Sequence, residues 1–155
     1  MKGDANVINE LNRLLAGELT AIDQYFLHSR MYENWGLTKL YERIEHERAE
    51  EVQHAEALIK RLLFLEGAPS LAAREPLKIG QDVPAMLQND LALERRVIVA
   101  LRTAIGVCEA AHDFQTREIL ERLLKDTEED HARWLEQQLW LIDKTGLPNY
   151  LQSQM

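Results

Sequence analysis

The chain is poor in the residues that cross-link a fold or interrupt its helices. Its 155 residues include one cysteine, four prolines and seven glycines. A single cysteine, Cys108, excludes an intrachain disulfide and a four-cysteine metal site. So few prolines and glycines leave room for long helices. Because 46% of the residues are apolar, the chain can build a core, and we expect one domain over residues 1–155.

The sequence also lacks a basic excess and a long apolar run. Its formal net charge of −8 argues against a nucleic-acid partner, because the phosphate backbone is bound by basic surfaces. No run approaches the roughly 20 apolar residues that a membrane span needs. The first residues, Met-Lys-Gly-Asp, do not open an apolar signal segment. We therefore expect a cytoplasmic protein with neither a membrane nor a nucleic-acid partner.

Four long stretches of the sequence have the apolar spacing of amphipathic helices. The first is expected over about 4–35 and the second over about 38–66, and a glycine follows each of them. Asp82 and Asp113 are suited to cap the third and fourth stretches. The stretches pair as helical hairpins over about 4–66 and 82–145, and Pro148 can begin a short fifth helix over 148–154.

Segment 67–81 joins the two hairpins and has no helical periodicity. It is rich in breakers, with Gly67, Pro69, Pro76 and Gly80. An extended segment of this length can run from one end of a helix bundle to the other. The sequence therefore predicts an all-α fold, a four-helix bundle with a long crossover between helices 2 and 3 and a short C-terminal fifth helix.

One pattern, Glu followed further on by Glu-x-x-His, occurs once in each hairpin. Residues three apart on a helix share a face, so each Glu-x-x-His directs a carboxylate and an imidazole at one point. All the members fall on the apolar rows of their helices, where a solvated charge is not expected. The six residues are Glu18, Glu51, His54, Glu94, Glu128 and His131.

Four carboxylates and two imidazoles form a ligand set for two metal ions, most plausibly iron. Buried carboxylates without partners are costly and become protonated, whereas two divalent cations balance four negative charges. We expect Glu51 and Glu128 to bridge the metals and Glu18 and Glu94 to be terminal ligands. The low coordination number leaves open positions, which suits redox chemistry with oxygen or peroxide. A purely structural polar core is the alternative interpretation.

Neighbouring residues extend this hypothesis. Tyr25 lies two turns after Glu18, and its hydroxyl could support a ligand carboxylate, although an ordinary core tyrosine fits the same position. His46, Glu47 and Glu50 form an acidic cluster just before Glu51, which is either an accessory iron site or solvated surface charge.

On these residues the sequence resembles the bacterioferritin branch of the ferritin family over essentially its whole length. The six metal positions match that family residue by residue. Its other characteristic stretches here are Met1–Asp4 with Val7-Ile8, Gln24-Tyr25-Phe26-Leu27-His28, Asn34-Trp35-Gly36-Leu37, Leu63-Phe64-Leu65-Glu66-Gly67, Asp90-Leu91-Ala92-Leu93-Glu94 and Asn149-Tyr150-Leu151-Gln152.

The resemblance implies a ferritin-like bundle and an iron-storing shell of 24 subunits, with a ferroxidase centre of two irons in each subunit. It further implies channel positions at Asn34 and Glu66, where three subunits meet, and at Asn149 and Gln152, on a four-fold channel. A ferredoxin-type reductant is a candidate partner of such a shell.

Haem is where the sequence departs from the haem-binding members of that family. In those members a Met directly follows the first Glu of the motif and ligates the haem iron. Here that position is Val52, which has no donor atom. We therefore expect a homo-oligomer without haem, unless a second, haem-binding subunit joins the shell.

The function expected from the sequence is storage and detoxification of iron through oxidation of Fe(II) by O2 or H2O2. Two points stay open: which oxidant is preferred, and whether the di-iron site is a transit site or a stable cofactor. A di-iron peroxidase or oxygenase acting on another substrate is one alternative, although a single cysteine excludes a rubrerythrin-type electron-transfer module. A DNA-protecting mini-ferritin is another, and the acidic charge argues against it.

Overall fold

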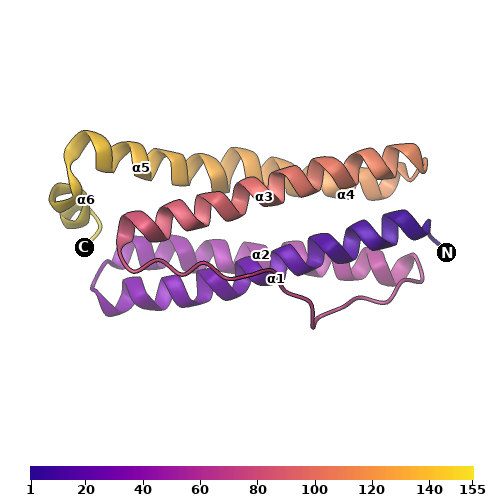
Figure 1. The fold of residues 1–155 in the computed structure, drawn as a ribbon, viewed down its shortest axis with the longest axis horizontal. Helices are drawn as coiled ribbons and strands as arrows, with labels where there is room; N and C mark the ends of the chain where they lie inside the picture. The colour runs from indigo at the N-terminus through magenta and orange to yellow at the C-terminus, as the bar shows by residue number, and fades with distance from the viewer.

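The computed structural model describes residues 1–155 and is built from helices joined by tight turns and one long connection (Figure 1). Four long helical segments lie side by side, and a short one closes one end of the bundle. The elements in chain order are α1 Ala5–Asn34, α2 Thr38–Phe64, α3 Val83–Ala110, α4 Phe114–Lys125, the π-helical segment η1 Asp126–Ala132, α5 Arg133–Thr145 and α6 Leu147–Ser153.

Aspartates begin three of the helices. Asp4 accepts hydrogen bonds from the backbone N–H groups of Asn6 and Val7, at 2.8 and 3.2 Å. Asp82 accepts one from Ala85 at 2.9 Å, and Asp113 accepts one from Thr116 at 3.0 Å. These bonds satisfy backbone donors that have no partner within the first helical turn. Two of the three caps, Asp82 and Asp113, lie where the sequence predicts them.

The long connection between α2 and α3 runs the length of the bundle, so that these two helices are parallel (Figure 1). Within each hairpin the helices are antiparallel. This arrangement confirms the expected fold: a ferritin-like four-helix bundle with a long crossover and a short C-terminal helix.

Polar residues on one side of α1 hold the crossover against the bundle. Asn12 accepts a hydrogen bond from Ser70 N–H, and Thr20 accepts one from Glu75 N–H, at 2.9 and 2.8 Å. Further along, Gln24 accepts one from Lys78 N–H and His28 accepts one from Gly80 N–H, both at 3.2 Å. The side chains of α1 thereby replace water for a backbone that has no secondary structure of its own.

The fourth long helix is not a regular α-helix. Seven residues, Asp126–Ala132, form a π-helical segment between α4 and α5. The sequence places Glu128 on the inward row with His131, but the wider turn instead puts Thr127, four residues before His131, on the buried side. The expected inward row is therefore wrong at this point of the helix.

The short helix α6 packs on the end of the bundle. The Tyr150 hydroxyl, which is buried, donates a hydrogen bond to Gln138 Oε1 on α5 at 2.8 Å. The backbone N–H of Lys39 on α2 donates one to the Gln154 carbonyl at 3.0 Å. No helix of the chain is both long enough and apolar enough to cross a membrane.

Candidate metal centre

Two groups of three ligand-type residues meet in the middle of the bundle and share one carboxylate. The first group is Glu18, Glu51 and His54, and the second is Glu51, Glu94 and His131. In each group the ligand atoms lie within 4.8 Å of one another, and all the residues are buried. The centre thus takes one residue from α1, two from α2, one from α3 and one from η1. Glu51 is the residue that belongs to both groups.

Several buried atoms of the centre lack a hydrogen-bond partner, which is unusual for polar groups inside a protein. The unpartnered atoms are both carboxylate oxygens of Glu18, Glu51 Oε1, His54 Nδ1, Glu94 Oε2 and His131 Nδ1. Carboxylate oxygens and imidazole nitrogens of this kind are suitable ligands for a divalent metal such as iron. The five residues therefore fit a pair of metal ions.

Burial and the close approach of like charges shift the pKa values of the residues in the cluster. Burial raises the pKa of Glu18 well above its usual range, and the Glu51 charge raises it further. Burial also raises the pKa of Glu94. Burial alone would lower the pKa of His54, but the neighbouring Glu18 and Glu51 carboxylates, 3.9 and 3.4 Å from its Nδ1, outweigh it and raise that pKa to about 11. The raised pKa values favour protonated carboxyl groups and a charged imidazole, and both reduce the net negative charge of the cluster.

Glu128, the sixth residue of the expected set, does not join the cluster. It is ion-paired with Arg102 of α3, whose Nη2 lies 2.7 Å and whose Nε lies 3.2 Å from Glu128 Oε1. Its side chain is 35% exposed, in contrast to the buried ligands. The π-helical turn explains this placement, because Glu128 is no longer in line with His131.

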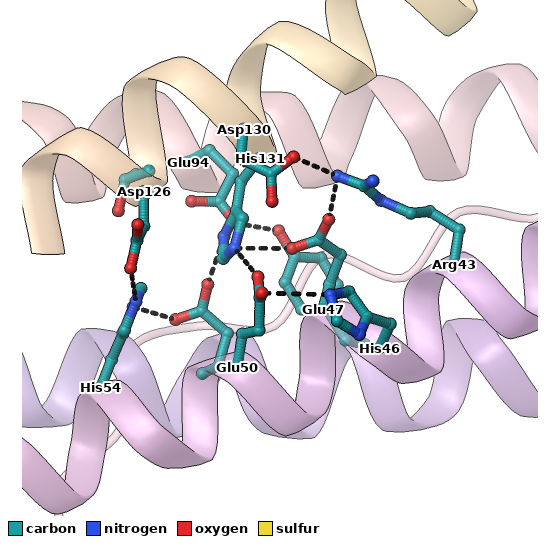
Figure 2. A network of polar contacts seen from close by, with 12 residues as sticks. Arg43, His46, Glu47, Glu50, His54, Glu94, Asp126, Asp130 and His131 are labelled. Carbon is teal, nitrogen blue, oxygen red and sulfur yellow. Dashed lines mark hydrogen bonds and ion pairs between the residues drawn. The ribbon is translucent and has the colours of Figure 1, made fainter.

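Other side chains support the cluster from outside. The Tyr25 hydroxyl donates a hydrogen bond to Glu94 Oε1, which is the contact that the sequence suggested for this tyrosine. His54 Nε2, the nitrogen facing away from Glu18 and Glu51, lies 3.1 Å from Asp126 Oδ2 (Figure 2). Asp126 could not be predicted from the sequence, because it and His54 lie on different helices and no helical spacing relates them.

A second acidic group lies against the outer nitrogen of His131. Its members are Glu47, Glu50 and Asp130 together with His131 itself. His131 Nε2 lies 2.6 Å from Glu47 and 2.7 Å from Glu50 (Figure 2). Its other ring nitrogen, Nδ1, lies 2.8 Å from Glu51 Oε1. The imidazole therefore lies between the two groups.

Two basic residues accompany this second group. Arg43 pairs with both Glu47 and Asp130, and it lies 2.8 Å from the latter. His46 Nε2 lies 3.0 Å from Glu50 Oε1, so the suggested accessory cluster of His46, Glu47 and Glu50 does come together in space.

The Ferritin-like domain model matches residues 8–145 of the chain. The chain belongs to the ferritin family. Among its relatives, the "Bacterial ferritin" of Synechocystis sp. is 57% identical over 155 residues, covering 100% of this chain and 99% of the relative. The "Bacterial ferritin" of Pseudomonas aeruginosa is also 57% identical, over 100% of both chains. The "Bacterioferritin" of Mycobacterium avium is 43% identical over 150 residues, covering 97% of this chain and 94% of the relative.

Membership of the ferritin family, together with the carboxylate and histidine groups, supports iron storage as the function and an oligomeric shell as its setting. The resemblance inferred from the sequence is thereby confirmed. The side chains at Asn34, Glu66, Asn149 and Gln152 are all exposed. Val52 lies on the outer side of α2 and is 44% exposed.

Proposed function

We propose that each subunit is a ferroxidase that oxidises pairs of Fe(II) ions before the iron is stored as a ferric mineral in the shell. The observation that carries this proposal is the pair of three-residue groups that share Glu51. In the first position Glu18, His54 and Glu51 hold one iron, and in the second Glu94, His131 and Glu51 hold the other. Here iron is the substrate of the centre.

The protein side of the reaction is binding and orientation. Two Fe(II) ions release two electrons, which together with two protons reduce one O2 to H2O2 or one H2O2 to two water molecules. Three protein ligands at each position leave coordination sites for the oxidant. Asp126 would fix the His54 ring so that Nδ1 faces the iron, and Tyr25 would fix the Glu94 carboxylate.

The test replaces the shared carboxylate. We expect Glu51→Ala to lose both metal positions and to slow Fe(II) oxidation by more than about a hundredfold, because the loss of even an outer partner of a ligand costs about 10–100-fold. Glu94→Ala should keep one position. Glu56→Ala is the matched control, since Glu56 lies on the same helix, is exposed and pairs only with Lys60.

Stoichiometry of Co(II) binding and the rise of ferric absorbance after mixing with Fe(II) and O2 provide the two readouts. Fast oxidation in Glu51→Ala, at the rate of Glu56→Ala, would contradict the assignment. A parallel experiment with H2O2 in place of O2 identifies the preferred oxidant.

The assembly is part of the same proposal. We infer a shell of 24 subunits with iron channels at Asn34 and Glu66 and at Asn149 and Gln152, and a ferredoxin-type protein as the reductant for iron release. Because Val52 offers no donor atom, the homo-oligomer should lack haem, and haem would enter only with a second, haem-binding subunit. Analytical ultracentrifugation and a visible spectrum of the pure protein test the size of the shell and the presence of haem.

A further inference from the structure

The Glu128–Arg102 ion pair joins η1 to α3, the two elements that also carry His131 and Glu94 of the proposed centre. Arg102 lies on α3, as Glu94 does, eight residues and therefore about 12 Å further along the helix. Glu128 lies three residues before His131, whose Nδ1 faces Glu51. The guanidinium donates two hydrogen bonds to the same oxygen, Oε1, of Glu128.

A centre that holds two divalent cations would be closer to neutral with the Glu128 carboxylate than without it. Glu18, Glu51 and Glu94 supply three negative charges, whereas two divalent cations supply four positive ones. One more carboxylate makes the buried cluster neutral, which lowers the cost of holding charge in the interior. Glu47 and Glu50 lie on the opposite, Nε2 side of His131, and Arg43 neutralises Glu47. Glu128 lies three residues before His131 in η1, and its only partner is the exposed guanidinium of Arg102.

We propose that Arg102 is a positioning residue that holds Glu128 outside the metal-free centre and competes with the second metal ion for its carboxylate. This inference rests on the proposed function. When the position formed by Glu51, Glu94 and His131 is filled, Glu128 leaves Arg102 and completes the ligand set, and the wide turn of η1 tightens around it. Arg102 therefore weakens the second metal position without affecting the first.

The experiment is a Co(II) titration of the assembled, metal-free protein in four forms: wild type, Arg102→Gln, Glu128→Gln and the double variant. Exposed ion pairs of this type contribute little, so we expect Arg102→Gln to tighten the second Co(II) by about two- to fivefold and to leave the first unchanged. Glu128→Gln should weaken the second Co(II) at least as much. The double variant should bind Co(II) like Glu128→Gln alone, because without the Glu128 carboxylate Arg102 has no ligand for which to compete with the metal.

A matched control is available on the same face. Arg95, also on α3, pairs with Glu136 of α5 at 3.4 Å, and its side chain is 63% exposed, as is that of Arg102. Arg95→Gln removes the same charge at a distance from Glu128 and should leave both Co(II) affinities unchanged. Amide hydrogen exchange of wild-type residues 126–132 gives a readout without a mutation, and Co(II) should slow exchange there in the wild type and not in Glu128→Gln.

The outcomes separate this inference from the proposed function. A wild type that binds no pair of Co(II) ions overturns the proposed function itself. A wild type that binds two, with the second affinity unchanged in Arg102→Gln or in Glu128→Gln, overturns the role of Arg102 and leaves the ferroxidase proposal standing. A second affinity that shifts equally in Arg95→Gln also overturns it, because the effect is then one of general charge.

Discussion

Replacing Asp90 with alanine should loosen the crossover and destabilise the bundle. Asp90 and His28 are both fully buried, and Asp90 Oδ1 lies 2.8 Å from His28 Nδ1. The same oxygen accepts a hydrogen bond from Gln24 Nε2 at 2.8 Å. Because Gly80 N–H donates to His28 Nε2, the proton of this imidazole lies on Nδ1 and points at Asp90. In Asp90→Ala two buried donors lose their acceptor at once.

The size of the effect follows from these contacts. A buried donor left unsatisfied costs about 1–3 kcal/mol, so two cost about 2–6 kcal/mol. Part of this is offset because the variant no longer buries the Asp90 carboxylate, whose pKa burial raises. We therefore expect a net loss of about 2–4 kcal/mol in the free energy of unfolding. Asp90→Asn keeps an acceptor oxygen in the same place and should lose less than about 1 kcal/mol.

Urea denaturation of the metal-free protein, at one fixed subunit concentration, measures this difference. Limited trypsin digestion gives a local readout, because Arg74 and Lys78 are exposed residues within the crossover. Cleavage there should be faster in Asp90→Ala than in Asp90→Asn, since the crossover opens more often. Equal unfolding free energies for the alanine and asparagine variants would refute the reasoning, because the contacts would then contribute nothing.

Three further outcomes can be measured. As the pH rises above 3.8, the ordinary pKa of an aspartate, wild type should lose stability relative to Asp90→Asn in urea denaturation, because burial raises the pKa of Asp90 and the folded protein keeps a proton that the unfolded chain releases. Tyr25→Phe should slow Fe(II) oxidation by about 10–100-fold, whereas Tyr32→Phe, whose buried hydroxyl has no partner, should not. Burial raises the pKa of Cys108 to about 11, so the native thiol should resist a disulfide reagent at pH 8 and react once urea unfolds the chain.

Much of the fold could be predicted because helical periodicity and breakers record it directly. The caps Asp82 and Asp113 directly precede α3 and α4, and the break at Gly67 lies three residues after the end of α2. The length of the crossover could be predicted, but the hydrogen bonds that hold it against α1 could not. Its backbone is bonded by side chains that the apolar pattern of α1 does not distinguish from other polar positions: Asn12, Thr20, Gln24 and His28.

The centre could be predicted as far as α-helical geometry applies. Glu51 and His54 lie in regular α2, and their spacing of three brings them to one point, as expected. The same spacing in Glu128 and His131 fails, because these residues lie in a π-helical turn that a fixed period of 3.6 cannot reveal. Asp126 could not be predicted either, because it lies 72 residues from His54 in the chain and helical periodicity relates only residues of the same helix.

The π-helical turn also has a consequence for the architecture beyond the centre. An additional residue in a regular helix rotates everything that follows by about 100°, since each residue advances the helix by that angle. Here the widened turn absorbs the surplus locally, so Leu135 still faces the core and Gln138 still meets Tyr150. Deleting Thr127 would therefore remodel the candidate metal centre while sparing the register of α5, which makes this turn a place where the centre can diverge without disturbing the rest of the bundle.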